Sequence, residues 1–318
     1  MKAQTLAPLV GDLRQFASVR QVILDDGPER GQRALLFSTG GGLDFMVLVD
    51  RAMDIGTLSF RGLPLAWQSP AGLRSPWLTD LESEQGRGFN RSFSGFLVTC
   101  GLEHIRQPGN GSPLHGRLPG TPARLVAHGE AWDGDEPLLY CEGEVVQAAH
   151  GKECLRLRRR IEAPVGSTVL RIFDRVENIG PAASPHALLY HINFGYPAIG
   201  AEATVSLDGR TVLGSLQIAD PNAEPAVTCL RAGAAPTARC VLASNGPAGE
   251  TTIAFSSDVL PFAQFWTDLR PRIGVVAIEP CTSDRRADGT SEPNLVLQPG
   301  EARSYRLEIS VRDTPGSG

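Results

Sequence analysis

The amino-acid sequence predicts an all-β protein, folded as one large antiparallel β-sandwich. Short stretches in which apolar and polar residues alternate recur along the 318-residue chain, and turn residues separate them. The 35 glycines and 24 prolines suit many tight turns. Helical patterns are confined to residues 11–17 and 77–82, whereas a parallel α/β fold needs a helix between most strands. We therefore expect one β-sandwich domain over residues 1–318, with few short helices.

Period-two alternation identifies the expected strands in chain order. They cover residues 43–49, 95–100, 138–146, 154–161, 168–176, 251–255 and 272–278. The clearest alternation lies in residues 303–312, where Tyr305 and Leu307 alternate with polar residues, as on a sheet with one face in solvent. Pro299 and Gly300 predict the turn before it. We expect this last strand to complete a sheet that begins early in the chain.

The composition narrows the class of protein. At 42% hydrophobic content the chain can bury a large core, and its net charge of -5 comes with acidic and basic residues intermixed. That mixture offers no basic stripe to nucleic acid and no polybasic patch to a membrane. No apolar run approaches the roughly 18 residues of a membrane span, and the N-terminus lacks a signal-peptide core. We expect a cytoplasmic monomer or homodimer without nucleic-acid or membrane partners.

Residues 187–197, ALLYHINFGYP, set an imidazole and an amide among apolar and aromatic residues. The run 188–190 predicts a buried strand, which places His191 and Asn193 on the same face, two residues apart. A buried histidine needs a partner for each ring nitrogen. Two interpretations therefore stay open for His191: a hydrogen-bonded core residue, or a member of a functional site.

Two further candidate side chains lie next to bends or strand ends. His115 lies between Pro113 and Gly116, where the glycine would let a ligand or another backbone approach closely. A histidine in a loop is more often a surface residue. Arg91 precedes the strand expected at 95–100, and its fork of donors could hold a hydroxyl or a carboxylate, although most arginines at strand ends are solvated.

Residues 262–282 combine a carboxylate, an amide and an indole with apolar neighbours. Glu279 follows an apolar run and precedes Pro280, which we expect to end the strand. A carboxylate at such a place either opens into a cleft or faces solvent. Gln264 and Trp266 would share one face, and an aromatic ring beside an amide suits a sugar ring, although a core tryptophan is commoner.

Motifs for several other chemistries are missing from the sequence. There is no GxSxG elbow, no phosphate-binding P-loop and no GxGxxG followed by a helix. Zinc spacings of the HExxH or paired CxxC type are also missing, and the six scattered cysteines indicate reduced thiols. An acid/base pair of His191 with Glu279 and a second histidine, His115, remain. Such a pair calls for neither a metal nor a cofactor.

Three motifs in order carry a family resemblance. LHG at 114–116, YHINFGYP at 190–197 and VVAIEP at 275–280 resemble the aldose 1-epimerase (galactose mutarotase-like) superfamily. DRAMDIG at 50–56 and TCGLEH at 99–104 are similar to a poorly characterised branch of it. The resemblance implies a β-supersandwich with a small-molecule sugar in an open cleft on one sheet.

The resemblance also implies roles for individual residues. His191 matches the family's general acid and Glu279 its general base. The chain reads HINF where the family has HxYFN, and it shows no counterpart of the aspartate that holds sugar hydroxyls. The expected substrate-binding residues are His115, Arg91, Asn193, Gln264 and Trp266.

The activity that follows from the resemblance is the interconversion of sugar anomers. Ring opening needs a proton taken from the C1 hydroxyl and another given to the ring oxygen. We expect Glu279 as carboxylate and His191 as imidazolium, with the carboxylate holding the histidine pKa near neutrality. Two alternatives stay open: a non-catalytic carbohydrate-binding protein, and an isomerase or epimerase acting at another carbon.

Overall fold

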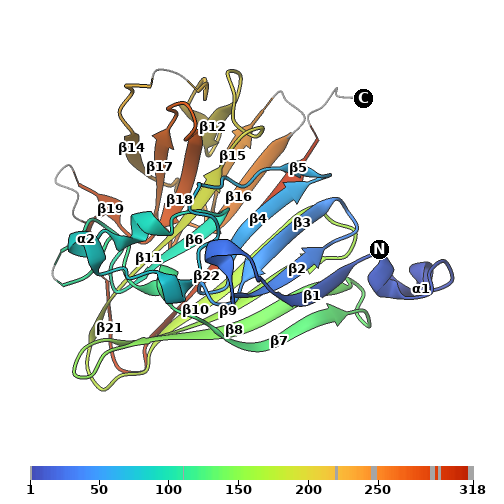
Figure 1. Ribbon diagram of the computed structural model, residues 1–318, viewed down its shortest axis with the longest axis horizontal. Helices are drawn as coiled ribbons and strands as arrows, with labels where there is room; N and C mark the ends of the chain where they lie inside the picture. The colour runs from blue at the N-terminus through green and yellow to red at the C-terminus, as the bar shows by residue number, and fades with distance from the viewer. Residues whose placement is uncertain are drawn as a thin grey trace.

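Two large sheets form the molecule (Figure 1), and every strand pair within them is antiparallel. The computed structural model describes residues 2–109, 111–218, 221–244, 249–286, 291–292 and 295–313. This architecture confirms the predicted all-β antiparallel sandwich. Among the described residues, no helix is long and apolar enough to cross a membrane.

The first sheet has eleven strands and carries most of the N-terminal part of the chain. Its main path runs β1 (Ser18–Ile23), β2 (Arg33–Ser38), β3 (Leu43–Leu48), β4 (Asp54–Phe60), β6 (Leu97–Leu102), β11 (Ser184–Phe194), β18 (Val275–Cys281), β17 (Phe262–Asp268) and β14 (Ala226–Arg231). Two short strands join it at the sides, β5 (Leu63–Pro64) on β4 and β21 (Leu295–Leu297) on β11.

The second sheet has nine strands and contains the long strands of the middle of the chain. Its order is β13 (Arg210–Leu213), β12 (Thr204–Leu207), β15 (Thr237–Ala243), β16 (Glu250–Ser256), β22 (Ala302–Arg312), β10 (Val169–Asn178), β9 (Cys154–Pro164), β8 (Leu138–Ala148) and β7 (Arg124–Ala131). A separate pair consists of β19 (Asp284–Arg285) and β20 (Ser291–Glu292).

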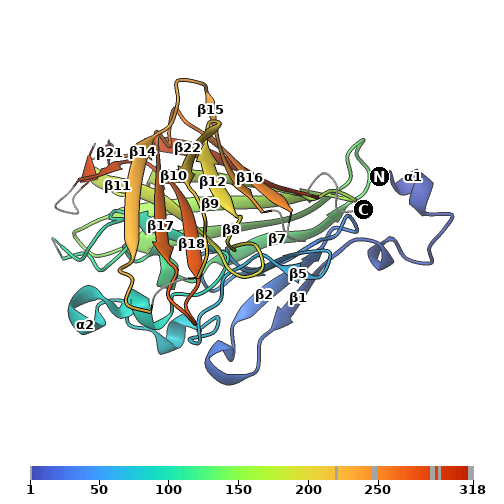
Figure 2. The ribbon, with the colours of Figure 1, turned by 90° about the horizontal axis from the view of Figure 1, so that it is seen from above.

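The helical segments are short and lie outside the two sheets. Figures 1 and 2 show α1 (Ala3–Leu6) and α2 (Ser83–Gly86) at opposite ends of the molecule. The 3-10 turns are η1 (Leu13–Gln15), η2 (Gly27–Glu29), η3 (Pro76–Leu78), η4 (Gly88–Arg91) and η5 (Leu118–Gly120). None of them is long enough to cover a sheet, as the sequence predicts.

A hydrophobic core fills the space between the sheets and contains residues of both. The predicted alternation in β22 is confirmed, since Tyr305, Leu307, Ile309 and Val311 are buried. The place of this strand is not the predicted one, however. It pairs with β10 and β16 in the middle of the nine-stranded sheet, whose first strand in the chain begins only at Arg124. Side-chain alternation reports which face is buried but not which strand lies alongside.

A polar cluster bridges the two sheets inside this core. The Arg159 guanidinium on β9 bonds both carboxylate oxygens of Asp174, at 2.9 and 2.7 Å, and one oxygen of Asp54 on β4, at 3.1 Å. Thr99 on β6 donates to Asp54, and the Tyr190 hydroxyl on β11 donates to Asp174 at 2.7 Å. Burial raises the pKa of Asp54 to about 6, against the effect of Arg159. The cluster thus gives each buried polar group a partner from the opposite sheet.

Strand β18 corrects one prediction. The strand expected at 272–278 lies at Val275–Cys281, so Glu279 is an interior residue of the strand and Pro280 does not end it. Pro280 still pairs with Ala263 across β17. Proline removes one hydrogen-bond donor, so a strand can pass through it where the neighbouring ladder is interrupted.

Candidate active site

Strands β11 and β18 bring His191 and Glu279 side by side. Their ladder pairs Leu189 with Cys281 and Ile192 with Ile278, but no pairing joins the intervening residues, all of which the structure describes. The interruption coincides with Pro280, which has no N–H to donate. Nε2 of His191 lies 3.4 Å from Oε1 of Glu279 at this point. The predicted pairing of these two residues is therefore present in the fold.

His191 points away from the core between the sheets. Successive side chains of a strand point to opposite faces, and the preceding Tyr190 reaches Asp174 in the second sheet. His191 and Asn193 therefore share the outer face of the first sheet, as predicted. Segments before and after β6 cover this face, so His191 is only 4% exposed and Glu279 is fully buried.

Asn193 sets the tautomer of the imidazole. Its side-chain nitrogen donates to the carbonyl of Gly95 at 2.9 Å, so its oxygen is the acceptor that faces His191. Nδ1 of His191 lies 2.6 Å from that oxygen and must carry a hydrogen to bond it. In the neutral ring Nε2 then holds the lone pair, and Nε2 is the atom next to Glu279.

Gln264 and Arg106 hold the carboxyl group from the other side. The Gln264 amide donates to Oε2 of Glu279 at 2.5 Å and accepts from Nη1 of Arg106 at 3.2 Å. Arg106 is itself anchored on the carbonyl of Ser283 at 2.6 Å and on the hydroxyl of Ser291 at 2.9 Å. Oε1 of Glu279 is buried and has no hydrogen-bond partner among the described residues. That oxygen is the one that faces His191.

Burial shifts the protonation of both groups toward their neutral forms. It raises the pKa of Glu279 to about 8, although Arg106 and the hydrogen bond from Gln264 oppose the rise. It lowers the pKa of His191 to about 4, although the hydrogen bond to Asn193 opposes the fall. Near neutral pH the pair therefore holds one proton, on the carboxyl group. The expected pair of carboxylate and imidazolium, with the histidine pKa near neutrality, is corrected, because desolvation outweighs the effects of Arg106, Gln264 and Asn193 that favour the charged forms.

Aromatic side chains surround the exposed edge of His191. The Phe93 ring centroid lies 4.9 Å from that of His191, the Trp266 ring 5.9 Å and the His115 ring 5.6 Å. All three are only partly buried. These half-buried rings form the side from which a small molecule could reach the pair, and an aromatic wall suits the apolar face of a sugar.

His115 is held in place by its backbone and by one hydrogen bond. It has φ 63°, and its Nδ1 lies 3.1 Å from the carbonyl of Ile105, to which it donates. A Cβ at the following Gly116 would lie 2.3 Å from the Gly101 carbonyl oxygen, so a neighbouring backbone does approach this glycine closely. Burial and the adjacent His191 lower the pKa of His115 to about 3, so its ring is neutral.

Arg91 lies apart from the group formed by the other predicted residues. Its side chain is 69% exposed and donates to Glu84 at 2.6 Å. No hydrogen bond or ring contact joins it to His191, Glu279 or Trp266 in the described part of the chain. Its role in binding a substrate stays a prediction.

Arg106 is, like Phe93, a member of the site that the sequence did not reveal. It follows the 99–104 motif in a loop, where neither strand periodicity nor a known spacing singles it out. Only the pairing of β17 with β18, which places Gln264 opposite Glu279, brings the loop arginine into the network. Within the described residues, no group of three or more His, Cys, Asp or Glu side chains could hold a metal ion.

Solved structures with the same fold include sugar-acting and related proteins. A Klebsiella pneumoniae protein with the provisional description aldose 1-epimerase has a TM-score of 0.85 and 21% identity, over 99% of this chain and 87% of that one. A galactose mutarotase-like protein from Clostridium acetobutylicum has a TM-score of 0.61 and 14% identity, over 93% and 98%. Galactose 1-epimerase from Lactobacillus acidophilus has a TM-score of 0.59 and 13% identity, over 93% and 99%.

These similarities show a galactose mutarotase-like fold, as the sequence motifs predict. Comparison with the curated proteins found no match for the chain. A family model matches residues 29–311, which is most of the chain. The chain therefore belongs to the family described as a domain of unknown function, DUF4432.

Proposed function

We propose that the protein is a carbohydrate isomerase that interconverts the anomers of a free sugar by opening and closing its ring. The observation that carries this proposal is the approach of His191 Nε2 to Glu279 Oε1 at 3.4 Å, with each group oriented by its own amide. Two groups that exchange one proton are what ring opening requires. The fold shared with proteins named for aldose and galactose 1-epimerase activity supports the same reaction class.

The resting protonation sets the direction of the proton transfers and reverses the roles that the family resemblance implies, with Glu279 as the acid and His191 as the base. The Glu279 carboxyl group gives its proton to the ring oxygen as the bond between that oxygen and C1 breaks. Nε2 of His191 accepts the proton of the C1 hydroxyl, and C1 becomes an aldehyde carbon. The pair is then a carboxylate and an imidazolium. Rotation about the C1–C2 bond and reversal of both transfers close the ring as the other anomer and restore the pair.

Substrate access in this proposal runs past Phe93, Trp266 and His115. Because Glu279 is fully buried, the sugar must displace the Phe93 ring from its contact with His191 to reach the pair. Trp266 would then face the sugar ring, and the Nε2 atom of His115 is left to contact a hydroxyl, since its Nδ1 is engaged with Ile105. Each of the two reacting groups is expected to increase the rate of anomer exchange about 10²- to 10⁴-fold.

The test is exchange NMR or polarimetry on a panel of freshly dissolved aldoses and ketoses. Acceleration of anomer exchange for at least one sugar, strongly reduced in Glu279→Gln and kept in the exposed His150→Asn control, supports the proposal. Saturable binding of a sugar without any acceleration identifies a carbohydrate-binding protein instead. Conversion of a sugar into an epimer at another carbon identifies the second alternative, which uses the same pair.

A further inference from the structure

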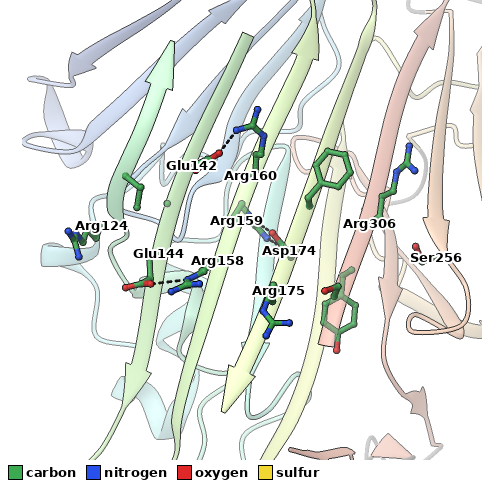
Figure 3. Close-up of a pocket in the computed structure, with 15 residues that line it drawn as sticks. Arg124, Glu142, Glu144, Arg158, Arg159, Arg160, Asp174, Arg175, Ser256 and Arg306 are labelled. Carbon is green, nitrogen blue, oxygen red and sulfur yellow. Dashed lines mark hydrogen bonds and ion pairs between the residues drawn. The ribbon is translucent and has the colours of Figure 1, made fainter. Parts of the chain in front are cut away.

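The outer face of the nine-stranded sheet carries a concavity that shares no residue with the candidate active site. It is a pocket of about 710 Å³ whose outward-facing lining comes mainly from β7, β8, β9, β10 and β22. Figure 3 shows these neighbouring strands with the labelled arginines along them. Tyr190 and Asp174 meet in the core between the sheets, so this pocket and His191 lie on opposite outer faces of the sandwich. The volume lies within the roughly 300 to 1,000 Å³ of small-molecule sites.

The pocket is built from two adjacent rows of residues that lie opposite one another across the strands. The first row runs Glu142, Arg160, Phe173 and Arg306. The second row runs Arg124, Glu144, Arg158, Arg175 and Ser304. The two rows hold five arginines and two glutamates, but Arg160 also pairs with Glu162 and Arg306 lies 3.7 Å from Glu308. The positive excess therefore lies in the second row, on a chain whose net charge is -5. A local excess of one sign in a concavity attracts ligands of the opposite sign.

Arg158 and Arg175 give the strongest indication that the pocket binds an anion. They are directly opposite each other on β9 and β10, where like charges destabilise the pair of strands. Arg158 donates to Glu144 at 3.3 Å, but Glu144 also lies 3.6 Å from Arg156 and so is shared. Arg175 has no ion pair among the described residues, and Arg124 has none either. The arrangement leaves room for an anion between two guanidinium groups, which bind phosphate or carboxylate with paired donors.

Phe173 adds an apolar surface to this charged row. It lies between Arg160 and Arg306, and the Arg306 guanidinium is 5.6 Å from its ring centroid. The ring is only partly buried on the outer face. A ligand that places a carbon ring on Phe173 and an oxyanion on the neighbouring arginines would use both features. A second copy of this face is disfavoured as the occupant, because two positive surfaces repel each other.

We propose that this arginine pocket binds a small organic anion, a ring-bearing phosphate ester or carboxylate, with its oxyanion between Arg158 and Arg175 and its ring against Phe173. The proposal does not depend on the isomerase activity, because the pocket shares no residue with the His191 and Glu279 network.

The experiment measures binding by calorimetry and thermal unfolding at constant ionic strength. The probes are glucose 6-phosphate, glucose, citrate and inorganic pyrophosphate. The pocket variant is Arg158→Gln with Arg175→Gln, and the control is Arg30→Gln, an exposed arginine that pairs with Asp25 in the loop between β1 and β2. We expect saturable binding of glucose 6-phosphate to the native protein and to the control, tighter than that of the ring-free citrate and weakened at least about tenfold in the pocket variant. Without ligand, the pocket variant should unfold at the native temperature or above it, because a repulsion is removed.

Two comparisons separate the parts of the proposal. Phe173→Ala should weaken the binding of glucose 6-phosphate and leave the binding of pyrophosphate unchanged. This comparison distinguishes recognition of the ring from recognition of the oxyanion. Sugar phosphate that binds at the active site would not respond to the Arg158 and Arg175 substitutions, and anomer exchange should be unaffected by them. Equal affinity of the native protein and the pocket variant for every anionic probe, or no saturable binding at all, overturns the proposal.

Discussion

Nε2 of His191 and Oε1 of Glu279 face each other at 3.4 Å where the ladder between β11 and β18 is interrupted. Each group is oriented from behind, His191 by Asn193 and Glu279 by Gln264. Since both are buried, their pKa values move apart in the direction that keeps both neutral. One proton shared between two oriented atoms is the chemical basis of the predictions below.

The pH profile of anomer exchange should have an acid limb due to His191 and an alkaline limb due to Glu279. The pair is active with His191 neutral and Glu279 protonated, so activity should rise as His191 loses its proton near pH 4 and fall as Glu279 ionises near pH 8. Residual activity of His191→Asn should lose the acid limb and keep the alkaline limb, and Glu279→Gln should show the reverse. Rates of single turnovers over pH 3 to 10 provide the measurement. Loss of the alkaline limb in His191→Asn would mean that the imidazolium is the acid after all.

The stability of the fold should fall with rising pH above 6.5. Between its ordinary pKa of 4.5 and about 8, Glu279 is protonated in the folded chain and ionised in the unfolded chain, so the folded state binds more protons and loses stability as pH rises. His191 acts in the opposite direction, but only between about 4 and its ordinary 6.5. Urea unfolding from pH 6.5 to 8 should give a slope on the order of 1 kcal/mol per pH unit, which Glu279→Gln flattens. An unchanged slope in that variant would show that another group is responsible.

Removing the Arg106 charge should shift the alkaline limb to higher pH. Arg106 opposes the rise in the Glu279 pKa that burial causes, so Arg106→Met should let it rise further. The substitution also leaves Gln264 and the Ser283 carbonyl without a donor, which should cost about 1 to 3 kcal/mol of stability. Arg106→Lys keeps the charge and serves as the matched control. A limb that does not move in Arg106→Met contradicts the electrostatic link.

The buried cluster around Arg159 should tolerate no single deletion. Arg159→Leu leaves the carboxylates of Asp174 and Asp54 without their cation in the core, so it should lower the free energy of unfolding by about 3 to 5 kcal/mol. The neighbouring Arg158→Gln lies on the outer face and should change it by less than about 0.5 kcal/mol. Denaturant unfolding of both variants makes the comparison. Similar losses in the two would show that the cluster does not stabilise the sandwich.

Substitution of the exposed Arg91 should affect substrate binding without affecting the stability of the fold. Arg91→Ala breaks only a surface ion pair with Glu84, so its effect on stability should stay within about 1 kcal/mol. If Arg91 reaches the sugar, KM should rise several-fold while kcat stays within about twofold. Glu84→Ala, which frees Arg91 from its ion pair, is the control. An unchanged KM in Arg91→Ala removes this residue from the substrate-binding set.

The strand pattern and part of the site could be predicted from the sequence, because both depend on local alternation. Period two identified the long strands β8, β9, β10 and β22, but it missed others, among them β1, β2, β12 and β15. It also put His191 with Asn193 on one face, and the two residues are hydrogen-bonded. The motifs at 50–56 and 99–104 turned out to supply Asp54 and Thr99 to the cluster between the sheets. These two segments thus help to hold the two sheets together.

The amino-acid sequence by itself determined the strand content, the antiparallel class and the two groups able to exchange a proton, since these follow from side-chain chemistry and periodicity. Tertiary structure decided the rest. Pairing of strands far apart in the chain put Glu279 beside His191 and Gln264, and brought Arg106 to the network from a loop. Burial then determined the protonation of the pair, because the pKa of a carboxyl or an imidazole depends on the solvent that the surrounding fold excludes.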